Sequence, residues 1–219
     1  MLDVKNITKI YHNPNKEVRA LDGVSLNVGS GEFVAVEGPS GSGKSTLLLA
    51  AGSLLAPDKG QILIDGQNPY ALSFDGRAKF RAEKIGFVFQ QFHLIPYLSV
   101  LENILMPSIL MKVGNTHERA MQLIERFALT ERVHHVLAEL STGERQRTAL
   151  ARAFMNSPNV ILADEPTGNL DTKNAEIVIK SLAEFVSTGG SVLLVTHDVY
   201  AAQYATKTLH LENGKIRND

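Results

Sequence analysis

Residues 38–46 are Gly-Pro-Ser-Gly-Ser-Gly-Lys-Ser-Thr, which fits the pattern G-x-x-x-x-G-K-[ST]. An apolar segment precedes this stretch at 33–36, and another follows it at 47–51. The order of strand, glycine-rich loop and helix is the context that a phosphate-binding loop requires. Glycines let the backbone turn its N–H groups toward an anion, and the helix that follows adds the positive end of its dipole.

The motif predicts a site for the phosphates of a nucleotide. Lys44 is expected to reach the β- and γ-phosphates of ATP, and the Ser45 hydroxyl is expected to ligate Mg²⁺. A flexible Gly/Ser turn is the structural alternative. Both the motif and the apolar segments on its two sides favour a phosphate-binding loop instead. The predicted ATP-binding residues are Gly38, Pro39, Ser40, Gly41, Ser42, Gly43, Lys44, Ser45 and Thr46.

Composition narrows the class of protein. The 219 residues are 44% hydrophobic, carry a net charge of −1 and include no cysteine. The chain therefore has enough apolar residues to form a hydrophobic core. A disulfide framework, a Cys-ligated zinc site and a globally basic nucleic-acid surface are not indicated. The most apolar stretch, at 47–56, is interrupted by Gly52 and Ser53 and is shorter than the roughly 20 residues of a membrane span. We expect any membrane role to come through a partner.

Apolar runs predict an α/β domain. Residues 1–30 alternate in hydrophobicity and predict antiparallel strands around a polar loop at 13–15. Continuous runs of the kind found in buried strands occur at 85–89, 160–163 and 191–195. A strand is also expected at 61–64 and a hairpin at 208–216, with helices at 71–84 and 173–186.

The pattern changes between residues 91 and 157. Helical spacing is found at 101–110, 116–129 and 142–155, and Asn115 with Glu118 predicts an N-terminal cap for the second helix. We therefore expect one domain, 1–219, in which a helical subdomain at 91–157 interrupts a nucleotide-binding α/β core formed by 1–90 and 158–219.

Asp164 and Glu165 follow a predicted buried strand. Ligands bind at the carboxyl ends of strands in open α/β sheets, so Asp164 is placed to hold Mg²⁺ and Glu165 to polarise a water molecule that attacks the γ-phosphorus. A solvated acidic pair is the structural alternative. The phosphate-loop pattern earlier in the chain favours the functional interpretation.

Three further side chains have two interpretations each. The Gln90 amide can ligate Mg²⁺ or simply end a strand, and His197 can contact the γ-phosphate or serve as a capping or core histidine. Tyr11 can stack on adenine or pack at the end of a strand. The chemistry of these residues alone does not decide between the alternatives.

Two segments have the signature of a helix start. Ser141 with Glu144 predicts a capping box, and the same helix N-terminus near Gly143 is a potential second phosphate site that another copy of the chain would use. Asp171 is expected to cap the helix that begins near residue 172.

Taken together, the motifs resemble the nucleotide-binding subunit of an ABC transporter. Residues 38–46 are similar to that family's Walker A motif, 162–165 to Walker B with its catalytic glutamate, and 140–146 to the LSGGQ signature. The remaining motif positions, the A-loop, Q-loop, D-loop and H-loop, fall at Tyr11, Gln90, Asp171 and His197. The finer resemblance is to the LolD/MacB/FtsE group, which includes DevA-like exporters.

The resemblance implies a P-loop NTPase (RecA-like) core with an antiparallel β subdomain and an inserted α-helical subdomain. It implies an ATPase that works as an ATP-dependent homodimer, in which Ser141, Gly143 and Glu144 act on the partner chain's ATP. Catalysis would use Glu165, His197 and Gln90, Mg²⁺ would be held by Ser45, Gln90 and Asp164, and Asp171 would lie in the D-loop.

The resemblance also implies an integral membrane permease subunit as partner, no nucleic acid, and a peripheral location on the cytoplasmic face of the inner or cell membrane. Two residues depart from the signature. Thr142 replaces its first glycine and would crowd the γ-phosphate or shift the backbone, and Glu144 replaces the commoner glutamine. Both departures are expected to affect the rate of hydrolysis.

The expected function is to power an exporter or a lipoprotein or lipid extruder. The alternative is an FtsE-like ATPase that signals to cell-wall enzymes and moves no substrate. A soluble ABC ATPase of DNA repair or translation would carry a coiled-coil insertion or a second cassette, and a small-molecule kinase would not need the signature or His197.

Overall fold

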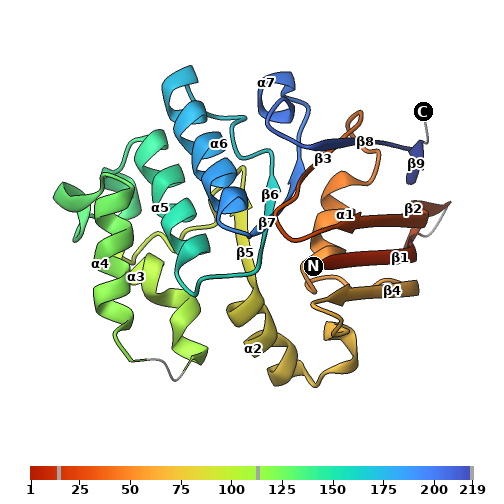
Figure 1. Ribbon diagram of the computed structural model, residues 1–219, viewed down its shortest axis with the longest axis horizontal. Coiled ribbons are helices and arrows are strands. Elements are labelled where there is room, and N and C mark those ends of the chain that lie inside the picture. Colours follow the sequence, from red (N-terminus) through yellow and green to blue (C-terminus); the bar gives the residue numbers. More distant parts are fainter. Residues whose placement is uncertain (14–15, 112–113, 218–219) are drawn as a thin grey trace.

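The fold is described by a computed structural model that covers residues 1–13, 16–111 and 114–217. Two residues of the loop predicted at 13–15 lie outside these ranges. A parallel sheet runs through the middle of the molecule, with a smaller antiparallel sheet at one end and a group of helices at the other (Figure 1).

The central sheet has six strands in the order β5-β6-β7-β3-β8-β9. Neighbours from β5 to β8 pair in parallel, and β9 pairs antiparallel with β8. The predicted C-terminal hairpin is present, and its first strand also joins the central sheet beside β3. The strands are β3 (Phe33–Glu37), β5 (Ile85–Phe89), β6 (Val160–Asp164), β7 (Ser191–Val195), β8 (Lys207–Glu212) and β9 (Lys215–Arg217).

Both faces of this sheet are buried, which explains its continuous apolar runs. Along β6, Ile161 and Ala163 belong to the core shared with α5 (Thr142–Phe154) and α6 (Thr172–Ser187), whereas Val160 and Leu162 belong to the core on the opposite face. Successive side chains of a strand point to opposite faces, so a strand covered on both sides is apolar along most of its length.

The smaller sheet is antiparallel, in the order β2-β1-β4. Its strands are β1 (Leu2–Asn13), β2 (Lys16–Val28) and β4 (Lys59–Ile64). Helix α1 (Lys44–Ala51) packs between this sheet and the central one, with Leu47 and Leu48 fully buried. The strand predicted at 61–64 is therefore an edge strand of the smaller sheet.

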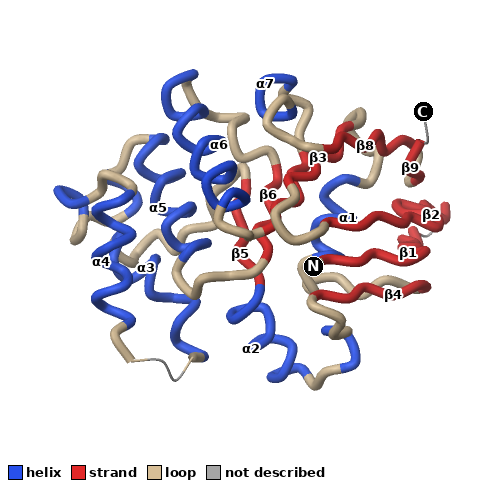
Figure 2. Tube along the Cα trace, viewed as in Figure 1, coloured by secondary structure: helices blue, strands red, loops and turns tan. Residues whose placement is uncertain are grey.

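Between β5 and β6 the described elements are helices, namely α3 (Val100–Leu105), α4 (Thr116–Arg126) and α5 (Thr142–Phe154), with short 3₁₀ turns at Met106–Leu110, Thr130–Arg132 and Leu137–Glu139. Figure 2 shows α3, α4 and α5 grouped at one side of the molecule, where α5 packs against β5. The single helix predicted at 101–110 is wrong, because the α-helix ends at Leu105 and a 3₁₀ turn follows. Pro107 lacks the N–H that an α-helix would need there.

The predicted cap of α4 is also wrong. Asn115 occupies the N-cap position, but its side chain accepts no capping hydrogen bond. Its backbone is left-handed, with φ of 62°, whereas a capping side chain needs an extended backbone to reach the helix N–H groups.

The remaining helices border the central sheet. They are α2 (Phe74–Lys84), capped by Ser73, α6 (Thr172–Ser187) and the short α7 (Val199–Ala202), with a 3₁₀ turn at Pro69–Ala71. In the parts of the chain that the structure describes, no helix has both the length and the apolar character to cross a membrane.

Candidate functional site

The phosphate loop follows a path that depends on glycine at both ends. Gly43 has φ of 108°, and a Cβ atom there would lie 2.1 Å from the Ala20 carbonyl oxygen. A Cβ atom on Gly38 would meet the carbonyl oxygen of Leu211 at the same distance. The loop is thus pressed directly against the backbones of β2 and β8, which fixes its shape.

Lys44 begins α1 and lies across the loop that precedes it. Its Nζ donates to the carbonyl oxygens of Gly38, at 2.7 Å, and Pro39, at 3.0 Å. The ammonium group is therefore held at the cavity that the loop borders.

The strand order brings the predicted residues to one edge. Strands β5, β6, β7 and β3 are successive parallel neighbours, so their carboxyl ends meet there. The residues after these ends line a cavity of about 650 Å³, together with the phosphate loop. The lining is Ala20, Gly38, Pro39, Ser40, Gly41, Gly43, Lys44, Ser45, Thr46, Gln90, Asp164, Glu165 and His197. Ser42 is instead buried beneath the loop, where its carbonyl accepts from the Gly214 N–H.

Asp164 ends β6 next to the first turn of α1. Burial raises the pKa of its carboxyl, and the neighbouring Ser45 hydroxyl opposes this rise. A cation would stabilise such a desolvated carboxylate, and carboxylate, hydroxyl and amide oxygens are ligands that Mg²⁺ accepts. Asp164, Ser45 and Gln90 all line the cavity, so the residues present fit this ion. Within the described ranges, no cluster of three or more His, Cys, Asp or Glu is placed to hold a metal.

Glu165 is held by the end of the neighbouring strand. Its backbone N–H donates to the Val195 carbonyl at 2.9 Å, with a left-handed φ of 45°. One carboxylate oxygen accepts from the Thr196 hydroxyl, at 3.1 Å, and from the His197 N–H, at 3.2 Å. The other lies 2.7 Å from the His197 Nδ1 atom. The sequence interpretation named Glu165 and His197 separately and missed both their contact and the part that Thr196 plays in it.

Gln90 lies against the loop that follows Glu165. A Cβ atom on Gly168 would be 2.9 Å from the Gln90 Nε2 atom, and the Asn169 side chain donates to the Gln90 carbonyl at 3.1 Å. The end of β5 is therefore in direct contact with the segment after β6. A lone glutamine gives no sequence signal for this contact.

The predicted capping box at the start of α5 is present. The Ser141 hydroxyl accepts from the Glu144 N–H, and the Glu144 carboxylate accepts from the Ser141 N–H at 2.7 Å and from Arg132 Nε at 2.7 Å. Thr142 is the first helical residue, and its side chain is exposed. Among the described residues, those that line the phosphate-loop cavity do not include Ser141, Gly143 or Glu144.

Asp171 and Tyr11 lie outside the cavity lining as the structure describes it. Asp171 caps α6 by accepting from the Asn174 N–H at 2.8 Å, as predicted. Tyr11 pairs with Val18 across β1 and β2, and both side chains are exposed. Ala20, two residues along β2 from Val18, does line the cavity, although no motif indicated it.

The fold and this edge define a class of protein. A glycine-rich loop joins a parallel strand to a helix, and an acidic residue ends a strand nearby in the same sheet, an arrangement typical of P-loop nucleoside triphosphatases. The predicted fold class is therefore confirmed.

Comparison with known proteins gives the family. Residues 21–168 match the family model described as ABC transporter. The chain is 41% identical to the uncharacterized ABC transporter ATP-binding protein MJ0796 of Methanocaldococcus jannaschii, over all of this chain and 96% of that protein. It is 42% identical to the macrolide export ATP-binding/permease protein MacB of Bdellovibrio bacteriovorus, again over the whole chain. The chain belongs to the ABC transporter family.

Solved structures agree with this assignment. The dimeric post-hydrolysis state of MJ0796 bound to ADP and Pi superposes with a TM-score of 0.92, at 40% identity, over all of this chain and 97% of that one. A second dimeric structure of MJ0796 gives a TM-score of 0.93. The chain spans about a third of the length of the MacB relative, 34% of it.

Proposed function

We propose that two copies of this chain bind ATP at a shared interface and that the resulting hydrolysis powers a membrane exporter. The observation that carries the proposal is the division of the predicted residues into two sets. The phosphate loop other than Ser42, together with Asp164, Glu165 and His197, meets at one cavity, whereas the Ser141 segment caps a helix elsewhere. A second copy would bring its own Ser141 segment to the phosphates held by the first. The dimeric MJ0796 structures support this arrangement.

In the proposed site the loop N–H groups, the start of α1 and Lys44 hold the phosphates of ATP. Ser45, Gln90 and Asp164 hold Mg²⁺, which supplies positive charge to the phosphate oxygens when it is bound. Tyr11, exposed beside Val18, stacks on the adenine ring.

Glu165 is the proposed general base. It takes a proton from a water molecule while the water oxygen forms a bond to the γ-phosphorus, and the bond from that phosphorus to the β–γ bridging oxygen breaks. His197 Nδ1 and the Thr196 hydroxyl fix the direction of the carboxylate. The other imidazole nitrogen can donate to a γ-phosphate oxygen only when it also carries a proton, which is the case in the imidazolium form.

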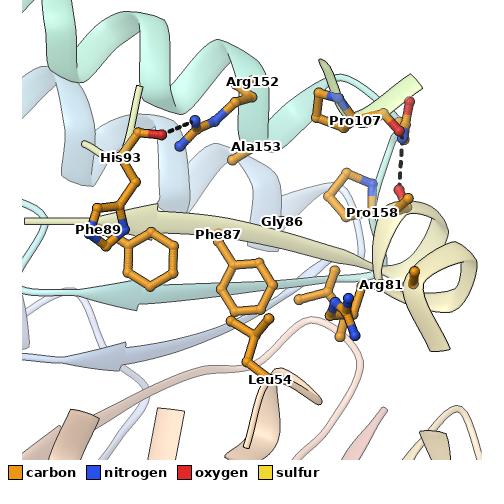
Figure 3. A pocket seen from close by; sticks show the side chains of 14 residues that line it. Leu54, Arg81, Gly86, Phe87, Phe89, His93, Pro107, Arg152, Ala153 and Pro158 are labelled. Atoms are coloured by element: carbon orange, nitrogen blue, oxygen red, sulfur yellow. Dashed lines mark hydrogen bonds between the residues drawn. The ribbon is translucent and has the colours of Figure 1, made fainter. Parts of the chain in front are cut away.

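A second cavity suits a membrane subunit. A groove of about 370 Å³ lies between α2, β5 and the end of α5 (Figure 3). Leu54, Phe87 and Phe89 give it apolar walls, and Arg81 and Arg152 place guanidinium groups at it. We propose that it receives a short cytoplasmic helix of a permease, which holds the cassette peripherally on the cytoplasmic face of the membrane.

Export is the proposed direction, because the MacB relative combines an ATP-binding part with a permease and is named for macrolide export. The FtsE-like signalling alternative is not favoured, because the relatives reported above are named as an exporter and as a transporter ATP-binding protein.

The decisive test uses Glu165→Gln, which keeps the size of the side chain but removes the base. Purified Glu165→Gln is expected to hydrolyse ATP at least about a hundredfold more slowly and to form a dimer in Mg-ATP but not in Mg-ADP. Light scattering after size exclusion measures the dimer, and phosphate release measures the rate. Lys180→Gln, on the exposed face of α6, is the control. An undiminished rate together with a monomer in Mg-ATP would refute the proposal.

A further inference from the structure

The N-terminal ends of α5 and α6 are joined by the side chain of one residue, Asn174. Its Oδ1 accepts from Arg147 Nη1 at 2.7 Å, which ties it to α5. Its Nδ2 donates to Asp171 Oδ2 at 2.8 Å, and its backbone N–H donates to the other Asp171 oxygen at 2.8 Å. One amide group therefore connects the helix that carries the Ser141 segment to the loop that Asp171 closes.

Asn174 also fills the space in front of Gly143. A Cβ atom on Gly143 would lie 2.5 Å from Asn174 Oδ1 and 2.8 Å from its Nδ2. At such distances a side chain at position 143 would push the Asn174 amide aside, because the amide rests directly on the α5 backbone. Gly143 is buried, whereas the two residues before it, Ser141 and Thr142, are exposed. The contact thus sets where the exposed N-terminus of α5 points.

The chemistry requires an amide. Arg147 needs an acceptor and Asp171 needs a donor, and among side chains of this length only asparagine offers both at one branch point. Aspartate would keep the acceptor for Arg147 but place a second carboxylate against Asp171. Leucine has nearly the same shape and offers neither bond.

We infer that Asn174 is a positioning residue that holds the Ser141–Glu144 end of α5 in fixed register with the Asp171 loop. The inference rests on the proposed function, in which that end of α5 binds the nucleotide of the partner copy. Asn174 does not line the phosphate-loop cavity as described, and it acts through Gly143 and Arg147. Binding of ATP by one chain alone, at the phosphate loop, does not depend on it.

The test introduces Asn174→Leu and Asn174→Asp into the Glu165→Gln chain. Three quantities are measured: the dimer dissociation constant in Mg-ATP by sedimentation equilibrium, the affinity of the monomer for ADP by calorimetry, and the melting temperature. Both variants are expected to dimerise at least about tenfold more weakly. Asn174→Leu loses the charge-assisted hydrogen bonds, and Asn174→Asp introduces a repulsion with Asp171. ADP affinity is expected to stay at the parent value, and the changes in melting temperature are expected not to parallel the loss of dimerisation. Lys180→Gln in the same chain is the control.

A second comparison isolates the contact with Gly143. Gly143→Ala alone is expected to weaken dimerisation, and Asn174→Ala in the same chain is expected to restore part of it, because the smaller side chain removes the clash. The inference would be overturned if the losses of dimer affinity caused by Gly143→Ala and Asn174→Ala were additive. It would also be overturned if Asn174→Leu dimerised as well as its parent, or if dimer affinity fell in parallel with melting temperature across the variants. A Glu165→Gln parent that never dimerises in Mg-ATP would instead overturn the proposed function, and this inference with it.

Discussion

Glu165 and His197 are joined side chain to side chain, with 2.7 Å between Oε1 and Nδ1. An ionised carboxylate only accepts hydrogen bonds, so the imidazole carries its proton on Nδ1 and leaves Nε2 without one in the neutral form. The Glu165 side chain is 13% exposed and that of His197 is 72% exposed. The carboxylate is therefore sheltered, and the imidazole presents its second nitrogen to the solvent side of the cavity.

Replacing His197 by alanine should slow hydrolysis and spare nucleotide binding. Glu165 would lose the partner that fixes its direction, so kcat is expected to fall about a hundredfold while ADP affinity stays constant. Steady-state phosphate release and calorimetry give the two numbers. His117→Ala, at an exposed position on α4, is the matched control. A kcat close to that of the unaltered protein would show that the contact has no part in the reaction.

Replacing Lys44 by alanine should, in contrast, weaken the binding of nucleotide. The ammonium now bonded to Gly38 and Pro39 lies at the cavity, and its loss should weaken ATP and ADP binding about 10- to 100-fold. Calorimetry with the purified chain measures the change. Lys59→Ala, exposed on β4, removes the same charge away from the cavity and should leave the affinity unchanged. Equal affinities for all three proteins would exclude a role of Lys44 in holding phosphate.

The sequence predicted those parts of the molecule whose cause is local. Buried strands such as β6 have continuous apolar runs because both faces are covered, and the capping box of α5 depends on two residues three apart. The phosphate loop could be predicted because its backbone conformation requires glycine at particular positions, so the motif is visible in the sequence.

What the sequence did not predict depends on which strands become neighbours. Glu165 meets Thr196 and His197 only because β7 pairs beside β6, and no periodicity in either segment contains that fact. Ala20 lines the cavity because the smaller sheet packs beside the phosphate loop, which no local sequence pattern indicates. The cap expected from Asn115 failed because the backbone before α4 takes a left-handed conformation that the side-chain pattern does not reveal.

Glu144 should stabilise the fold in a pH-dependent way. Hydrogen bonds from the Ser141 backbone and side chain, and the Arg132 guanidinium, lower the pKa of Glu144 from its ordinary 4.5 to about 2. A lowered folded-state pKa gives stability that is present above the unfolded pKa and is lost as pH falls through the folded one. Glu144→Gln is therefore expected to unfold about 1 kcal/mol more easily at pH 7, and this difference should shrink between pH 4.5 and pH 2.

Urea unfolding at several pH values measures that difference. Glu118→Gln, in the first turn of α4, controls for the general effect of removing a carboxylate from a helix start. A difference between the unaltered chain and Glu144→Gln that stays constant from pH 7 to pH 2 would mean that the charge of Glu144 does not stabilise α5.

Two glycines of the phosphate loop should respond very differently to alanine. Gly41 has φ of 79° but open space around a Cβ atom, so Gly41→Ala should cost only the backbone strain of about 1 kcal/mol. Gly43 has φ of 108° and the Ala20 carbonyl oxygen 2.1 Å from a Cβ atom, so Gly43→Ala must move the loop or β2. It is expected to lower the free energy of unfolding by about 3 kcal/mol. Urea unfolding of both variants separates the causes, because strain alone predicts similar losses and only the contact with Ala20 predicts a larger loss at Gly43.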